Sequence, residues 1–159
     1  MHPKLPSKAL IKANFDDPND GWVGLSLQSS SAAVEIVGSY TPGDSFLELI
    51  RALDVMFHEG GERTVTWYEE PQETDLCFFG RLTRVQLTVR RFRDRRRTKG
   101  GGDVLLDVTG SFEQVCRPLW RALRSLQGRF TQQDLEARWH REFPSDELDK
   151  LTRAIQAAK

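Results

Sequence analysis

Cysteine is scarce in this 159-residue sequence, and long apolar runs are missing from it. Cys77 and Cys116 both have bulky apolar neighbours, which is typical of buried free thiols in a reducing compartment and unlike the disulfide framework of a small secreted protein. No apolar stretch reaches the roughly 18 residues that a membrane helix needs, and no apolar core follows the positive charges of residues 1–10, so neither a membrane span nor a signal peptide is expected. We therefore expect a cytoplasmic protein that has no membrane partner.

Motifs of catalysis and metal binding are also missing. The histidines, His2, His58 and His140, have none of the spacings of a metal site, and no nucleophile elbow of the Gly-x-Ser-x-Gly type occurs. The glycines at residues 100–102 precede an expected strand, whereas a phosphate-binding loop leads into a helix. We expect no enzyme, no cofactor and no metal, and only a cleft that joins His58 or His140 to two acidic residues would indicate an enzyme.

The sequence has no net charge, because 23 lysines and arginines balance 23 acidic residues. Locally this balance fails. Between Arg81 and Lys99 there are nine basic residues and one acid, a net of +8, whereas between Asp44 and Asp75 there are nine acids and two arginines, a net of −7. If folding brings the two segments side by side, their fields cancel.

Alternation of apolar and polar residues predicts strands in two groups, three before the first helix and four after it. The expected strands are residues 9–15, 22–28, 33–37, 64–68, 76–80, 83–92 and 103–108. Because strands and helices are segregated along the chain, we expect a single α+β domain over residues 1–159. Its mainly antiparallel sheet of about six or seven strands has helices packed on one face.

Helix signals follow each group of strands. Thr41 and Pro42 are expected to begin an amphipathic helix that ends at Gly60. Ser111 with Gln114 predicts a capping box for a second helix, in which Pro118 produces a kink or moves the start toward Arg117. A short helix capped by Thr131 and Asp134, and a last helix that starts at Ser145, complete the expected order.

The acidic turn, residues 69–75, is the first candidate site. Its carboxylates lack the alternate spacing and the glycine of a calcium loop, so a solvated turn or a surface for a basic partner is expected. The candidate partner-binding residues are Glu69, Glu70, Glu73 and Asp75.

The basic hairpin, residues 90–99, is the second candidate site. The connection 91–102 is so rich in charge and glycine that we expect a mobile hairpin tip there. Three interpretations remain open, namely a solvated loop, a protein contact, and a nucleic-acid contact in which Phe92 stacks on a base. The candidate residues are Arg91, Arg93, Arg95, Arg96 and Arg97.

A spaced pattern covers most of the chain, from about residue 38 to residue 151. It consists of Gly38-Ser39-Tyr40, Leu49 and Ile50, Trp67 to Pro71, Val85 to Leu87, Trp139, and Phe143-Pro144. This pattern resembles a family of small uncharacterised bacterial proteins. The basic segment 91–99 departs from the pattern, so its role is expected to be peculiar to this protein.

Small α+β chains of this kind are similar to the immunity proteins of bacterial toxin systems, including contact-dependent growth inhibition. The resemblance implies a protein that neutralises a cognate toxin domain by covering or distorting its active site, for which complementary shape and charge suffice. The alternative is a nucleic-acid-binding accessory protein that uses the basic hairpin.

Overall fold

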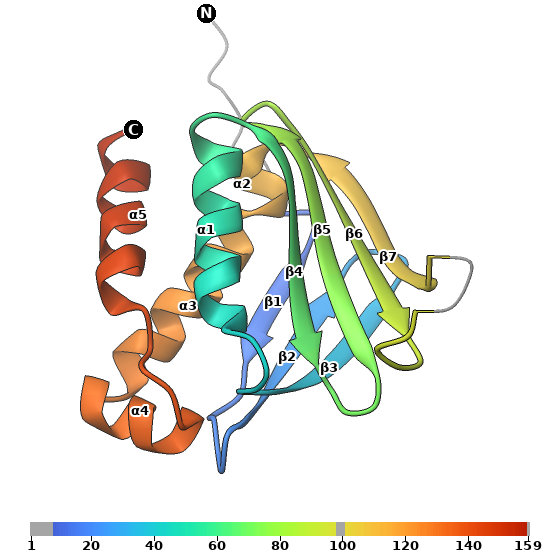
Figure 1. The fold of residues 1–159 in the computed structure, drawn as a ribbon. Helices are drawn as coiled ribbons and strands as arrows, with labels where there is room; N and C mark the ends of the chain where they lie inside the picture. The colour runs from blue at the N-terminus through green and yellow to red at the C-terminus, as the bar shows by residue number, and fades with distance from the viewer. Residues whose placement is uncertain (1–7, 98–100, 159) are drawn as a thin grey trace, which may run out of the picture.

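Apolar residues at every second position build the strands of one antiparallel sheet. In the computed structural model, which describes residues 8–97 and 101–158, the strand order follows the chain. Figure 1 shows the sheet with the helices on one face, so the predicted α+β class is confirmed. The strands are β1 (Lys12–Phe15), β2 (Trp22–Gln28), β3 (Ala33–Ser39), β4 (Gly61–Tyr68), β5 (Glu73–Arg81), β6 (Arg84–Phe92) and β7 (Asp103–Gly110).

The sheet has one apolar and one more polar face. On β6, Val85, Leu87 and Val89 are fully buried beneath the helices, while on the other face Gln86 and Arg90 are half-buried and Thr88 is buried. The opposite face is not covered by a helix, as Figure 1 shows. Side chains on that face therefore stay near solvent unless other side chains cover them.

Pairing between β3 and β4 is limited to one residue pair, Ser39 with Tyr68, whereas the other neighbouring strands pair along their whole shared length. Beyond that pair the two strands diverge. The first helix supplies hydrogen-bond partners for backbone groups on the free edge of β4. The Ser45 hydroxyl donates to the Thr66 carbonyl, and the Thr66 N–H donates to the Glu48 carboxylate. The sheet is thus divided into β1–β3 and β4–β7, with a helix at the division.

Helix α1 (Ser45–Phe57) begins three residues later than its sequence signals suggested. The expected start at Thr41 and Pro42 is wrong because the carboxylate of Asp44 accepts the N–H of Leu47, and this bond caps the helix at Asp44. The expected end is confirmed, since Gly60 has a left-handed φ of 78°.

The other helices are α2 (Phe112–Val115), α3 (Arg117–Arg129), α4 (Gln132–Trp139) and α5 (Ser145–Ala157). The capping box of Ser111 and Gln114 is present, and α3 starts at Arg117 with Pro118 in its first turn, as expected. Thr131 accepts the N–H of Asp134 and caps α4. Local signals therefore located all of these helix starts.

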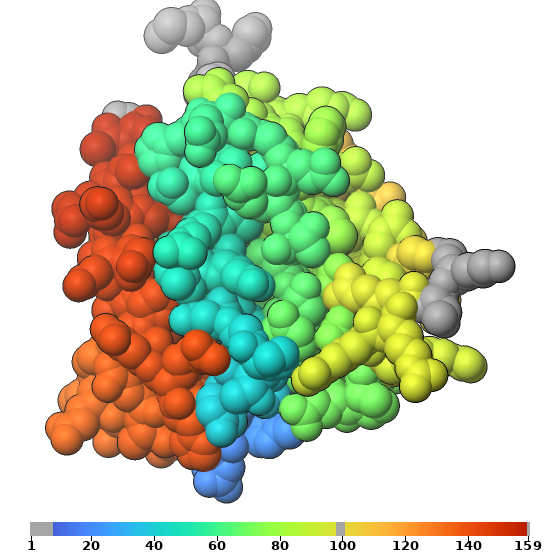
Figure 2. All heavy atoms as spheres, viewed as in Figure 1, coloured from blue at the N-terminus to red at the C-terminus, as the bar shows by residue number. Residues whose placement is uncertain are grey.

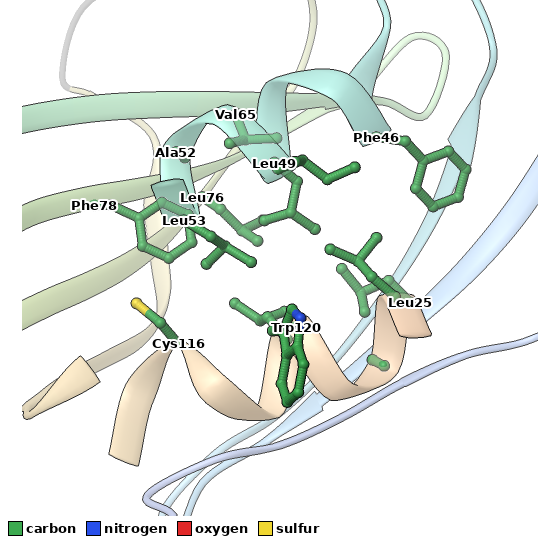
Figure 3. Packing of buried hydrophobic residues seen from close by; sticks show 14 of the residues in the cluster. Leu25, Phe46, Leu49, Ala52, Leu53, Val65, Leu76, Phe78, Cys116 and Trp120 are labelled. Carbon is green, nitrogen blue, oxygen red and sulfur yellow. The ribbon is translucent and has the colours of Figure 1, made fainter. Parts of the chain in front are cut away.

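The core is one continuous apolar cluster between the sheet and the helices. Figure 3 shows how Leu49 and Leu53 of α1 point toward Val65 of β4 and Phe78 of β5, with Trp120 of α3 on the other side. All the strands and helices contribute to the cluster. The sheet and the helices therefore share one apolar core.

Both cysteines are free thiols, as the sequence indicated. Cys116 is fully buried in the core, and its burial raises the pKa of its thiol. Cys77 is half-buried on the outer face of β5, where burial and the neighbouring Asp75 raise the pKa of its thiol. Within residues 8–97 and 101–158, no helix is both long and apolar enough to span a membrane.

The acidic turn is shorter than expected. The prediction of a turn over residues 69–75 is wrong at its C-terminal end, because β5 already begins at Glu73, and Asp75 is paired on both sides, with Thr66 of β4 and Arg90 of β6. Residues 98–100 of the expected mobile tip lie outside the described residues.

Candidate functional site

The acidic turn and the basic hairpin lie side by side at one end of the sheet. Pairing of β5 with β6 places Glu73 opposite Phe92 and Asp75 opposite Arg90. In Figure 2 the hairpin, in yellow, lies against the turn, in green. The ends of the two oppositely charged segments are therefore neighbours, and Glu69, Glu73 and Asp75 form ion pairs with arginines of the hairpin.

On the outer face of the sheet, Arg97 covers two buried carboxylates. Its guanidinium forms two parallel hydrogen bonds with Asp75, at 2.6 and 2.8 Å, and a third with Glu73 at 2.9 Å. The side chains of Asp75 and Glu73 are only 5% and 9% exposed. The Thr66 hydroxyl donates a further bond to Asp75, and the guanidinium carbon lies 4.1 Å from the centre of the Phe92 ring.

These contacts hold a full positive charge on Arg97. Hydrogen bonds to Asp75, followed by those to Glu73, raise the pKa of the guanidinium further above its usual range, although partial burial opposes the rise. A bidentate bond between arginine and a carboxylate fixes both distance and orientation. Arg97 therefore fixes the position of the chain beyond the turn that follows β6.

On the inner face, the side chains of Glu69 and Arg91 bond to backbone groups on the free edge of β3. The Glu69 carboxylate accepts the backbone N–H of Val37 at 3.1 Å, the Arg91 Nε–H at 3.2 Å, and the Thr74 hydroxyl. Arg91 donates a second bond to the Glu35 carbonyl at 2.7 Å. Because β4 ends before it reaches this part of β3, the two side chains take the place of a pairing strand.

The remaining candidate residues point away from these clusters. Glu70, Arg93, Arg95 and Arg96 are exposed. Arg95 is 68% exposed and reaches only to 4.0 Å from Glu73. Neither Arg93 nor Arg96 forms an ion pair with any residue that the structure describes.

A groove of about 450 Å³ separates the acidic turn from the basic hairpin. It is lined by Tyr68, residues 70–73 and residues 94–96. Within it, the Asp94 carboxylate accepts the backbone N–H of Arg96 at 2.9 Å, which shapes the tip of the hairpin. Burial, and then the nearby charges of Glu48 and Glu73, raise the pKa of the Tyr68 phenol. The phenol therefore stays protonated at neutral pH and is a hydrogen-bond donor.

A second cleft, of about 350 Å³, lies between α1 and α5 and joins His58 to Asp54 and Glu147. This is the kind of cleft that would indicate an enzyme. The His58 Nδ1 is 3.1 Å from the Asp54 carboxylate, but the two side chains are 50% and 51% exposed, so solvent screens the pair. None of the described residues that line the cleft is a serine, threonine or cysteine.

Metal ligands are not gathered in the part of the chain that the structure describes, where no group of three or more His, Cys, Asp or Glu side chains is arranged to hold an ion. His140 ends α4 in a left-handed conformation, and its ring packs edge-on against Tyr40 at 5.2 Å. Its position is explained by packing.

Comparison with protein-family models, curated proteins and solved structures finds no match. The functional argument therefore depends on the geometry of this chain. The sequence identified the nine charged candidate residues at this end of the sheet. It did not identify three uncharged residues beside them: Thr66 and Thr74, which donate hydrogen bonds to the acids, and Tyr68, which lines the groove. Position 74 carried a signal, because a threonine between Glu73 and Asp75 points to the opposite face of the strand from both acids.

Proposed function

We propose that this chain is a non-catalytic binding protein of the immunity type, which acts in the cytoplasm and neutralises a cognate toxin domain by direct contact. The observation that supports this proposal is that the arginines of the basic hairpin fall into two groups, one bonded to the sheet and one exposed. Arg91 and Arg97 are anchored to opposite faces of the sheet, while Arg93, Arg95 and Arg96 between them are exposed. The anchored residues present the exposed ones to a partner.

The anchors are better explained by positioning than by stability. Burying carboxylates such as Glu73 and Asp75 costs desolvation energy that an ion pair roughly offsets, so a buried pair is a weak source of stability. It does restrict geometry. Holding a loop in its bound conformation before the partner arrives reduces the entropy lost on binding, and arginine is enriched among residues that dominate binding energy.

The acidic turn is the less favoured contact surface. Glu69, Glu73 and Asp75 are already satisfied by internal donors, and only Glu70 is exposed. Reversing the charge of all four would remove buried ion pairs and destabilise the fold, so such a variant does not isolate a binding role. The exposed arginines remain as the charged surface of this end of the sheet.

Nucleic-acid binding is disfavoured by the position of Phe92. A base needs a free aromatic face for stacking, but the Arg97 guanidinium lies over the Phe92 ring at 4.1 Å. A protein partner that carries acidic side chains can pair with the exposed arginines without needing a free aromatic face.

The experiment is protection of growth. The product of the reading frame directly upstream of this gene, which the proposal takes to be the toxin, is expressed in a bacterial host with the wild-type protein, with the variant Arg93→Glu/Arg95→Glu/Arg96→Glu, or with Arg51→Glu/Arg121→Glu/Arg153→Glu as a control. The control makes the same change of net charge at three exposed arginines on α1, α3 and α5. We expect wild type and control to restore growth and bind the toxin domain, and the hairpin variant to do neither.

Three results would contradict the proposal. If no toxin is encoded beside this gene, or if the wild type gives no protection, the immunity role is wrong. If the hairpin variant protects as well as the control, the surface is wrong. If the wild type binds an oligonucleotide with an affinity that falls steeply with salt, and the hairpin variant does not, the nucleic-acid alternative replaces the proposal.

A further inference from the structure

We infer that the groove between the acidic turn and the basic hairpin is the seat of a carboxylate side chain, a Glu or an Asp that the partner carries on an exposed segment. This inference rests on the proposed function in taking the partner to be a protein. It assigns the chemistry of the contact, which the proposed function leaves open.

Three donors of the groove are uncommitted. Arg95 is mostly exposed and its Nε lies 4.0 Å from the Glu73 carboxylate, beyond hydrogen-bond distance, while the Arg96 side chain pairs with no described residue. The Tyr68 hydroxyl likewise donates to no atom of residues 8–97 or 101–158. Two guanidinium groups and a phenol are the donor set that a carboxylate prefers, because arginine binds it with two parallel hydrogen bonds.

The acids of the same groove are mostly engaged. Glu73 accepts from Arg97, and Asp94 accepts the backbone N–H of Arg96. Only Glu70 among the lining acids has no partner within the described part of the chain. The groove therefore has more free donors than free acceptors, although the whole molecule is neutral.

The size of the groove limits what enters it. At about 450 Å³ it lies near the lower end of the range of small-molecule pockets, roughly 300–1,000 Å³, so it admits a side chain and its flanking backbone and excludes a helix. Pro71 and the Tyr68 ring in the lining supply apolar surface for the methylene groups of that side chain.

The experiment needs no toxin. The 15N-labelled protein is titrated with the capped peptide Gly-Ser-Glu-Glu-Ser-Gly and, as a matched probe, with the peptide that has Gln in place of both Glu residues. We expect saturable shifts of the backbone resonances of residues 70–73 and 94–96 and of the Arg95 and Arg96 Nε–H groups with the Glu peptide only. The variant Arg95→Gln/Arg96→Gln should weaken binding at least about tenfold, the effect of one charge-assisted bond.

Controls separate a seat in the groove from general charge attraction. Arg121→Gln/Arg153→Gln should bind the Glu peptide as the wild type does, and Tyr68→Phe should bind more weakly. Equal binding of the two peptides, shifts spread over other surfaces, equal losses in both arginine pairs, or no binding at millimolar peptide would each overturn the inference. Inorganic phosphate or a thymidine oligonucleotide that shifts the groove when the Glu peptide does not would also overturn it, in favour of phosphate.

The titration tests the carboxylate contact, and the growth assay tests the immunity role, so a negative result in one does not decide the other. If the peptide binds in the groove but the protein gives no protection, the carboxylate seat stands and the immunity role falls. If protection depends on the hairpin but no peptide binds, the partner uses the exposed arginines without entering the groove.

Discussion

Arg96 and Arg97 are neighbours in a run of three arginines, yet they do opposite things. Arg97 donates hydrogen bonds to two buried carboxylates, and Arg96 is exposed. Nothing local in the sequence distinguishes them, because the difference arises from the pairing of β5 with β6 and from the turn made by Asp94. The clustering of charged residues in the sequence was enough to predict this site. The role of each arginine could be assigned only from the folded structure.

The unequal roles of these two arginines predict unequal effects on stability. Replacing Arg97 by Gln leaves Asp75 and Glu73 buried with fewer donors, so we expect the free energy of unfolding to fall by about 1–3 kcal/mol, since the 31% exposure of Arg97 lets solvent screen part of the loss. Denaturation by urea measures it. The matched change Arg96→Gln should alter stability by less than about 0.5 kcal/mol. Equal effects would mean that the buried pairs do not form in solution.

Glu48 predicts a pH dependence. Burial, followed by the charges of Asp44 and Asp75, raises the pKa of its carboxyl above 4.5, while the hydrogen bond from the Thr66 N–H opposes this rise. A raised folded-state pKa means that folding favours the protonated form. The stability that Glu48 contributes is therefore complete below its unfolded pKa and is lost as pH rises through the folded pKa.

The variant Glu48→Gln isolates this titration, because its amide oxygen can still accept the Thr66 N–H. We expect the stability of the variant relative to the wild type to increase as pH rises above about 4.3, the ordinary pKa of a glutamate, and to level off once Glu48 is ionised in the folded state as well. Urea denaturation at several pH values gives the difference. A difference that is constant, or that grows toward low pH, would be incompatible with the raised pKa.

At the scale of elements, helices were better predicted than strand ends. Caps are local, so the capping box at Ser111, the threonine cap at Thr131 and the proline at position 118 each located a helix start from a few adjacent residues. The start of α1 failed because two capping residues, Thr41 and Asp44, lie close together and only Asp44 reaches the N–H of Leu47. Capping chemistry was right, but the choice between candidates needed backbone geometry.

Strand ends depend on pairing with distant residues. The prediction began the fifth strand at Leu76 because Glu73 and Asp75 looked like turn residues, yet β5 begins at Glu73. The two acids stay in the strand because Arg97, more than 20 residues away, supplies compensating charge. No local window contains that information.

The edge of β3 offers a test of a side chain that replaces a strand. Removal of the Glu69 carboxylate in Glu69→Ala leaves the Val37 N–H without its acceptor, so this amide should exchange with solvent faster, by about tenfold or more. Hydrogen exchange followed by NMR measures the rate. The neighbouring variant Glu70→Ala removes an exposed carboxylate and should leave the rate unchanged. Equal rates in both variants would show that Glu69 does not protect β3.

At the scale of the whole molecule, folding cancels part of the charge segregation of the sequence. The segments with net charges of +8 and −7 meet at one end of the sheet, where Glu69, Glu73 and Asp75 pair with Arg91 and Arg97. The sequence therefore located the right region but overstated its charge, because the pairing across β5 and β6 leaves Arg93, Arg95 and Arg96 as the exposed remainder.

The aromatic cluster around Phe46 predicts that the sheet and the C-terminal helices unfold together. The Phe46 ring lies 5.4 Å from that of Trp67 in β4, 4.9 Å from that of Trp139 in α4 and 5.2 Å from that of Phe143, which precedes α5. Because one side chain joins strand and helices, tryptophan fluorescence and far-ultraviolet circular dichroism should give the same urea midpoint. A separate, earlier transition in either signal would divide the chain into two units.

The variant Phe46→Ala extends that test. It should lower the free energy of unfolding by about 3–5 kcal/mol and move both midpoints by the same amount, because the cavity weakens both sides of the cluster. The control Phe79→Ala removes a side chain that is 62% exposed on the outer face of β5, so its effect should stay below about 1 kcal/mol. If Phe46→Ala shifted only the midpoint from circular dichroism, to which the helices contribute most, the sheet would be stable without the helices, and the core would not be shared.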